Sequence, residues 1–137
     1  SGTVTSQNLG AIGKAAEGFV TGVGYSPLID TAENKKFVAA FEAANKALPD
    51  LYGADSYGVL YFYKAAVEKA KSTDTDRVRT AMRDLEWSTP QGVKKMRAGD
   101  HQAMQDMYAV RVTDGKFVIV GKVPAAAAVG PDACTKF

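Results

Sequence analysis

The most distinctive side chains are a cluster of aromatic residues in the middle of the chain, Tyr57, Tyr61, Phe62 and Tyr63. A phenol buries apolar area and keeps one hydroxyl for hydrogen bonding, so tyrosines suit both a hydrophobic core and the wall of a small-molecule site. We predict that Tyr63 packs in the core, because it continues a helical stripe through Val67. We predict that Tyr57 lies at the start of a helix and faces a cleft, where unpaired backbone N–H groups attract anions.

The residue types that catalysis requires are present, but not in a catalytic pattern. His101 is the only histidine and lies in a polar turn, with no nucleophile motif in the chain to partner it. Cys134 has no basic neighbour except Lys136, which does not favour a reactive thiol. Asp74 and Asp76 are typical of a helix start. Without a phosphate loop, a dinucleotide fingerprint or metal-ligand spacing, we expect no catalytic residue, no metal and no cofactor.

Length and composition are those of one ordinary globular domain. The chain has 137 residues, of which 46% are hydrophobic and 23% are charged, and its net charge is +2. The apolar fraction is too high for intrinsic disorder, and so small a charge does not favour a nucleic-acid partner. The longest apolar run is too short to span a bilayer. A single cysteine excludes an internal disulfide framework and a cysteine-rich zinc site.

The last residues are rich in alanine, proline and glycine and carry almost no charge. Such a segment is a poor core strand, and we expect residues 124–131 to lie on the surface as an extended tail. Alternatively, Cys134 forms a disulfide with a cysteine outside the given sequence, which would attach this tail to a partner.

The first half of the chain predicts a strand followed by a helix. β-branched and aromatic residues interspersed with glycines indicate a strand at residues 18–25. Asp30 or Thr31 can cap the helix that follows, Pro49 ends it, and residues 51–53 form a connection. One face of this helix is predicted to enter the core, with Phe37, Phe41, Ala44 and Leu48.

The rest of the chain predicts two more helices and then strands. The second helix covers residues 56–70, and the third begins at Thr73 or Asp74 with a buried stripe of Val78, Ala81, Met82 and Leu85. A strand is expected at residues 93–98. Alternation at 108–112, the Asp114-Gly115 pair and the apolar run 117–120 predict a β hairpin. A strand, three helices and a C-terminal hairpin indicate part of an α/β protein.

Several short motifs, taken in order, are similar to a known family. They are GKAAEG at 13–18, YSP at 25–27, DTAENK at 30–35, FVAAF at 37–41, DSY at 55–57 with YKAA at 63–66, TPQG at 89–92, DHQ at 100–102 and DGKF at 114–117. The series resembles the C-terminal part of type I periplasmic binding proteins, in the branched-chain amino acid, amide and urea-binding group that serves ABC transporters.

This resemblance implies part of a two-lobed fold. Full members are more than twice as long, so residues 1–137 would be a single fragment. Residues 1–28 and 103–137 would belong to the second lobe, 29–91 would supply first-lobe helices, and 92–102 would cross between lobes. Half a cleft cannot close on a ligand. The chain is therefore expected either to be a piece of a longer protein or to pair with other chains, as a homodimer that completes its sheets.

The resemblance also implies a function and a site. We expect a non-enzymatic solute-binding component of an ABC importer, in the periplasm or tethered outside the membrane. It would bind a small amino acid or an aromatic or small carboxylate and deliver it to a permease. Thr3 and Thr5, in the loop before GKAAEG, and Tyr57 are the candidate ligand contacts. Two alternatives stay open: the ligand-binding ectodomain of a receptor, and a non-catalytic α/β domain of an enzyme.

Overall fold

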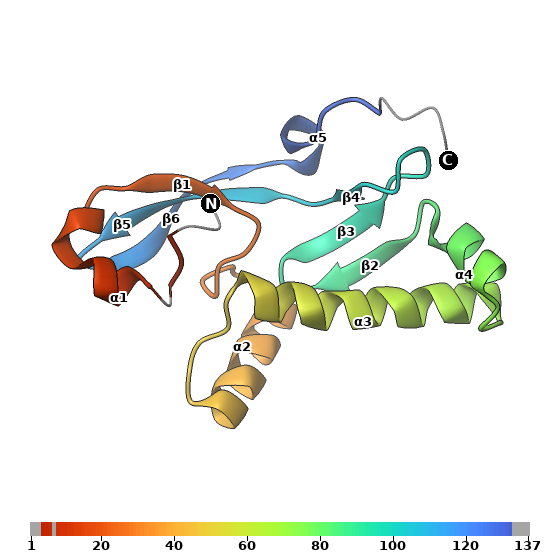
Figure 1. Ribbon diagram of the computed structural model, residues 1–137, viewed down its shortest axis with the longest axis horizontal. Coiled ribbons are helices and arrows are strands. Elements are labelled where there is room, and N and C mark those ends of the chain that lie inside the picture. Colours follow the sequence, from red (N-terminus) through yellow and green to blue (C-terminus); the bar gives the residue numbers. More distant parts are fainter. Residues whose placement is uncertain (1–3, 7, 133–137) are drawn as a thin grey trace.

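A computed structural model describes residues 4–6 and 8–132, and in it two small sheets lie end to end (Figure 1). Both are antiparallel and three-stranded. The first has the order β1-β5-β6, with β1 Val20–Val23, β5 Met107–Thr113 and β6 Lys116–Val123. The second has the order β2-β3-β4, with β2 Glu86–Thr89, β3 Gly92–Met96 and β4 Ala103–Met104. The mixture of helices and strands agrees with the predicted α/β class.

The first sheet follows the predicted alternation. Tyr108, Val110 and Val112 are buried on one face of β5. The turn into β6 has positive φ at both Asp114 and Gly115, 52° and 71°, as a type I′ turn requires. The short helix α1 Leu9–Ile12 and a 3-10 turn at Gly13–Ala16 pack against this sheet, where Leu9, Ala16 and Val112 form one apolar cluster.

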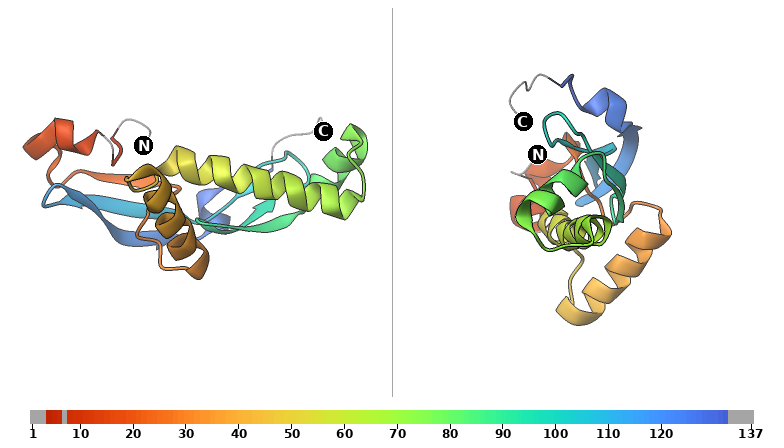
Figure 2. Two further views of the ribbon diagram at one scale, coloured as in Figure 1. Left: turned by 90° about the horizontal axis from the view of Figure 1, so that it is seen from below. Right: turned by 90° about the vertical axis from the view of Figure 1, so that its right-hand side faces the viewer.

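Helix α2, Ala32–Asn45, begins as predicted but ends earlier. Thr31 is the N-cap, since its hydroxyl accepts a hydrogen bond from Asn34 N at 3.1 Å. The helix ends at the left-handed residue Lys46 and not at Pro49. Its last turns project away from the rest of the chain (Figure 2), so Ala44 and Leu48 are exposed. The predicted core face is therefore wrong beyond Phe41.

Helix α3, Leu51–Ala70, begins where the sequence predicted a connection. Asp50 caps it, because its Oδ1 accepts a hydrogen bond from Gly53 N at 2.8 Å. The predicted start at residue 56 is wrong, and Tyr57 lies inside the helix and not at its first turn. The side chains that α3 buries recur every fourth residue and are those of Ala54, Gly58, Phe62 and Ala66.

Gly58 lets α3 approach the second sheet closely. A Cβ at Gly58 would lie 3.3 Å from Thr89 Cγ2, and one turn further Phe62 packs on Trp87 with ring centroids 4.4 Å apart. Tyr63 lies about 100° further round the helix than Phe62. Its side chain is 49% exposed, so the prediction of Tyr63 as a core residue is wrong.

Helix α4, Thr75–Met82, packs beside the end of α3 (Figure 1). Asp74 is its N-cap, and its Oδ1 accepts a hydrogen bond from Arg77 N at 3.1 Å. Val78 and Ala81 are buried as predicted. At the other end of the chain, the predicted extended tail contains one helical turn, α5 Ala125–Ala128. Cys134 lies outside the described residues.

The turn between β3 and β4 holds an ion pair. Arg97 Nε donates to Asp100 Oδ1 at 2.8 Å, and Arg97 Nη2 pairs with Oδ2 of the same carboxylate. Hydrogen bonding to this guanidinium lowers the pKa of the Asp100 carboxyl from 3.8 to about 2. Because the pKa is lower in the folded chain, the stabilisation is present above about pH 4 and is lost as the pH falls toward 2.

We therefore expect Asp100→Asn to be less stable than the wild type at neutral pH and equally stable near about pH 2. Asparagine keeps an oxygen that can accept the hydrogen bond from Gln102 N, now 3.0 Å long, so the turn itself is preserved. Urea unfolding of both proteins at a series of pH values measures the difference. A difference that does not change with pH would contradict the assignment.

Candidate functional site

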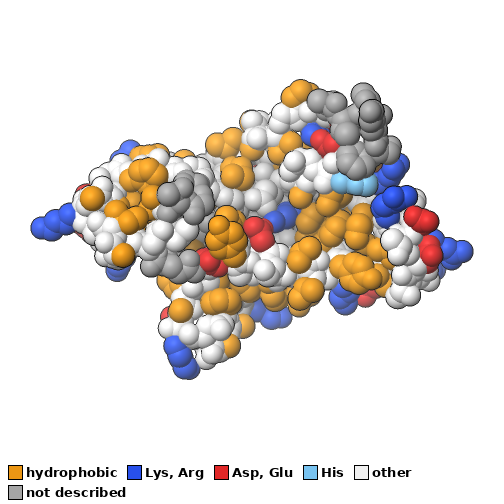
Figure 3. Space-filling model, in the orientation of Figure 1, with side chains coloured by type: hydrophobic (Ala, Val, Ile, Leu, Met, Phe, Trp, Pro, Cys, Tyr) orange, Lys and Arg blue, Asp and Glu red, His pale blue; other side chains and the backbone are white. Residues whose placement is uncertain are grey.

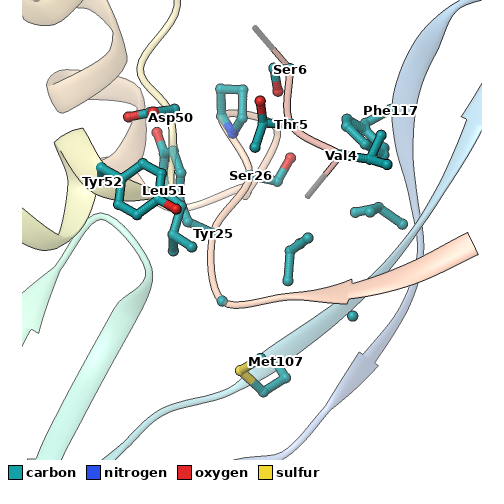
Figure 4. Close-up of a pocket in the computed structure, with 15 residues that line it drawn as sticks. Val4, Thr5, Ser6, Tyr25, Ser26, Asp50, Leu51, Tyr52, Met107 and Phe117 are labelled. Atoms are coloured by element: carbon teal, nitrogen blue, oxygen red, sulfur yellow. The ribbon is translucent and has the colours of Figure 1, made fainter. Parts of the chain in front are cut away.

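A cavity of about 200 Å³ lies beside the first sheet, and its walls come from that sheet, from residues 4–6, from the turn after β1 and from the start of α3. Figure 4 shows Leu51 and Tyr52 on one side, Val4 and Phe117 on the other, and Met107 at the base. The lining residues are Val4–Ser6, Gly22–Pro27, Asp50–Tyr52, Met107, Val110 and Phe117. Four segments that are distant in the sequence therefore meet at one pocket.

The pocket combines an apolar interior with a few polar groups. Val110, Phe117 and Met107 give it apolar surface, while Thr5 and Ser6 contribute hydroxyls. Asp50 contributes the only carboxylate, and no Lys, Arg or His is present among the described lining residues. Such a wall can accept hydrogen bonds from a ligand and can cover an aromatic or aliphatic group, as small-molecule sites do.

Tyr25 forms a fixed part of this wall. It is buried, and its hydroxyl donates to Asn34 Oδ1 at 3.0 Å. Burial raises the pKa of the Tyr25 hydroxyl, and the negative charge of Asp50 raises it further, so the phenol stays protonated at neutral pH. Next to it, Ser26 Oγ accepts a hydrogen bond from Leu28 N at 3.2 Å, which shapes the turn that leaves β1.

The predicted ligand contacts have different positions in the structure. Thr5 lines the pocket. Thr3 lies outside the described residues. Tyr57 is not a lining residue: its ring lies 4.8 Å from that of Phe37, and its hydroxyl donates to the Tyr61 hydroxyl at 3.2 Å, which raises the pKa of Tyr57.

The part of the wall formed by Asp50, Leu51 and Tyr52 was not predicted from the sequence. Asp50, three residues before Gly53, is a possible helix N-cap and could have indicated that a helix begins there. Residues 51–53 were instead predicted to be a connection. Met107 could not be found in this way, because only the pairing of β1 with β5 brings it beside residues 22–24.

Other candidate chemistry is sparse in the described part of the chain. His101 lies in a turn, with φ of 55° and its backbone N–H donating to Arg97 O at 3.0 Å. Among residues 4–6 and 8–132, no group of three or more His, Cys, Asp or Glu could hold a metal ion. In the same residues, no helix is both long and apolar enough to cross a membrane.

Comparison with protein families identifies the chain. Residues 1–116 match the family model for periplasmic binding proteins. The chain belongs to the periplasmic binding protein family. The resemblance noted in the sequence is thereby confirmed. No curated protein sequence matches the chain.

Solved structures of ABC transporter proteins have the same fold as this periplasmic binding protein chain. A benzoate-bound ABC transporter solute-binding protein from Rhodopseudomonas palustris has a TM-score of 0.80 and 30% identity, over 96% of this chain and 36% of that one. An ABC-type branched-chain amino acid transporter from the same species has a TM-score of 0.83 and 29% identity. The match covers 97% of this chain and 38% of that one. A third structure is an ABC transporter solute-binding protein from Rhodopseudomonas palustris in complex with 3,4-dihydroxybenzoic acid. Its TM-score is 0.78 and its identity 27%, and the match covers 88% of this chain and 35% of that one.

The chain spans little more than a third of the length of these relatives. It therefore carries part of the periplasmic binding protein fold, in agreement with the predicted fold class. The matched part supplies the two sheets and the pocket beside the first of them.

Proposed function

We propose that this chain is part of the solute-binding component of an ABC importer, which traps a small carboxylate or an amino acid between two lobes. The observation that carries the proposal is the pocket. Its walls come from the first sheet and from the start of α3, and they combine apolar surface with hydroxyls. The relatives solved with benzoate and with 3,4-dihydroxybenzoic acid support an aromatic acid as ligand. The relative described as a branched-chain amino acid transporter supports an amino acid.

We assign the two sheets to different lobes of the whole protein. The resemblance implied that residues 1–28 and 103–137 supply the second lobe and residues 29–91 the first. β3 pairs with both β2 and β4, so we extend the first-lobe part to residue 104 and place the second passage at 105–106 in place of 92–102.

The charge of the pocket bears on how the ligand lies. Asp50 would repel a carboxylate and attract an ammonium or a phenolic hydroxyl. We therefore propose that the ligand directs a hydrogen-bond donor toward Asp50 and its own carboxylate toward the opposite lobe. Tyr52, which is largely exposed beside Asp50, would cover the apolar part of the ligand.

Tyr52→Ala should weaken binding about tenfold, because it removes roughly 1.4 kcal/mol of apolar contact, and Thr5→Val should weaken it less. Calorimetric titration with benzoate, 4-hydroxybenzoate and leucine, on the natural protein and on residues 1–137 in parallel, measures the effect. Tyr63→Ala is the matched control, since Tyr63 lies on the same helix outside the pocket and is half exposed. If no ligand of this panel binds, or if Tyr52→Ala and Thr5→Val both bind like the wild type, the proposal fails.

Tyr57 stays a predicted ligand contact and belongs in the same series. We expect Tyr57→Ala to weaken ligand binding more than it lowers stability. Because the Tyr57 ring packs on Phe37, the melting temperature has to be measured beside the affinity. Unchanged affinity would remove Tyr57 from the site.

The outer face of α3 bears on the partners of the chain. Val59 and Leu60 are 56% and 70% exposed, and hydrophobic side chains gather over α3 and the second sheet (Figure 3). A helix that is apolar all round is normally buried all round. Since the relatives are far longer than this chain, we propose that further polypeptide of the two-lobed protein covers this face. Light scattering on the natural protein should then give a monomer, whereas a stable dimer of it would instead favour the homodimer.

The proposed function implies a location in the cell and a membrane partner. We propose a non-enzymatic protein of the periplasm, or one tethered outside the membrane, that delivers its ligand to an ABC permease. Deleting the gene should abolish uptake of the ligand and leave the ligand chemically unchanged in the medium. A receptor ectodomain would leave uptake intact, and an enzyme would convert the ligand.

A further inference from the structure

The polar groups of the pocket lie at two different places. Figure 4 shows Thr5, Ser6 and Ser26 on one side of the pocket and Asp50 with Tyr52 on another. The first group comes from residues 4–6 and from the turn after β1, and each of its members carries a hydroxyl that can donate. The second group contains the carboxylate. A ligand that fills the pocket therefore meets hydrogen-bond donors on one side and an anion on the other.

Ser26 is the buried member of the hydroxyl group. It is 4% exposed, whereas Thr5 is half-buried and Ser6 is exposed. A hydroxyl can donate one hydrogen bond and accept two. Ser26 Oγ accepts one from Leu28 N at 3.2 Å, and it donates none to the residues that the structure describes. The pocket wall thus contains a buried hydroxyl donor that no described residue pairs.

Local hydrogen bonds fix the direction of this hydroxyl. The turn is closed by the hydrogen bond from Ile29 N to Ser26 O at 3.1 Å. The buried amide of Asn34 in α2 donates to Pro27 O at 3.1 Å and to Ile29 O at 2.8 Å, which holds the turn against the helix. Because the Leu28 N–H already occupies one side of Ser26 Oγ, the side chain is oriented before a ligand binds. Binding then costs little conformational entropy at this residue.

We propose that Ser26 is the specificity-determining residue for the carboxylate of the ligand, and that its hydroxyl donates to one carboxylate oxygen. This assignment rests on the proposed function of the pocket. Since Lys, Arg and His are absent from the described lining residues, neutral donors bind the carboxylate on this wall. Thr5 and Ser6 can supply two more donors, because their hydroxyls make no hydrogen bond with the described residues.

The charge of Asp50 disfavours the reverse orientation of the ligand. A carboxylate directed toward Asp50 would be repelled, whereas an ammonium or a phenolic hydroxyl can donate to it. An ammonium directed toward Ser26 carries only donors, so the Ser26 hydroxyl hydrogen would stay unpaired in a buried position, which is unfavourable. Charge at Asp50 and hydrogen-bonding capacity at Ser26 therefore select the same orientation, with the acid toward Ser26.

Two substitutions of Ser26 test the assignment in the natural protein, by calorimetric titration with benzoate, 4-hydroxybenzoate and leucine. Ser26→Ala removes the donor and should weaken binding about tenfold or more, as expected for a hydrogen bond to a charged group. Ser26→Asp keeps an oxygen that can accept from Leu28 N and adds a negative charge at this side of the pocket. It should therefore weaken binding further than Ser26→Ala.

Ser72 provides the matched control. Its Oγ accepts from Asp74 N at 3.0 Å, which is the same spacing of two residues, and it lies outside the pocket. Ser72→Ala and Ser72→Asp should leave the affinity unchanged. Melting temperatures of all four variants show what each turn hydrogen bond contributes to the fold. A purely structural role of Ser26 would lower the melting temperature and leave the affinity of the folded protein unchanged.

A crystal structure of the natural protein with the ligand of this panel that binds most tightly needs no substitution. A carboxylate oxygen should lie about 2.5–3.0 Å from Ser26 Oγ. A carboxylate bound elsewhere, unchanged affinity of Ser26→Ala, or tighter binding by Ser26→Asp would each overturn the assignment and leave the proposed function in place. If the natural protein binds no ligand of the panel, the proposed function fails, and the assignment of Ser26 fails with it.

Discussion

Phe37→Ala should lower the free energy of unfolding by about 3–5 kcal/mol, the cost of removing a well-buried phenylalanine. Phe37 is 6% exposed, and its ring lies 6.3 Å from that of Tyr25, 5.7 Å from that of Phe41 and 4.8 Å from that of Tyr57. The cluster around it includes Tyr108 of the first sheet and Ala54 of α3, so the substitution also weakens the packing of the first sheet against the helices. Urea unfolding followed by circular dichroism measures the loss.

Tyr63→Ala is the matched control for this substitution. Tyr63 is an aromatic residue on a helix as well, but it is half exposed, so its truncation should cost less than about 1 kcal/mol. A loss as large as that of Phe37→Ala would mean that the outer face of α3 is buried in the measured protein. The arrangement of α3 described above would then be incomplete in solution.

The elements that the sequence predicted correctly are those with a local signal. Thr31 caps α2 through its own hydroxyl, and the Asp114-Gly115 turn follows from the positive φ that this pair tolerates. The alternation in β5 is likewise a local pattern, which sets Tyr108, Val110 and Val112 on one buried face. In each case, residues within one turn or one strand determine the outcome.

The prediction of where α3 begins was wrong because opposing signals are present there. Gly53 and Gly58 lower helix propensity, while the Asp50 cap and the packing of Gly58 on Thr89 favour the helix. The packing involves a strand more than thirty residues away, which no local pattern contains. The same long-range contact decides that Phe62 is buried and Tyr63 is not.

The candidate site could be predicted only in part for the same reason. Thr5 came from the resemblance to the family, and it lines the pocket. Asp50, Tyr52 and Met107 belong to a helix start and a strand that are distant in the sequence, and the pocket exists only because β1 and β5 pair and the segment after β1 is bound to α2. A local sequence pattern does not indicate that these distant segments lie close together in the fold.

Asn34→Ala should lower the free energy of unfolding by about 3 kcal/mol or more, because each buried polar group left without a partner costs about 1–3 kcal/mol. The substitution removes three hydrogen bonds at once, those with Tyr25 OH, Pro27 O and Ile29 O. Alanine favours a helix more than asparagine does, which offsets only about half a kcal/mol. Chemical denaturation at neutral pH measures the balance.

Asn45→Ala separates the role of the buried amide from helix propensity. Asn45 lies on the same helix, is exposed, and makes one local hydrogen bond, from Nδ2 to Phe41 O at 2.9 Å. Its replacement should change stability by less than about 0.5 kcal/mol, because exposed sites outside such networks are tolerant. Equal effects of the two substitutions would show that Asn34 does not hold the segment after β1.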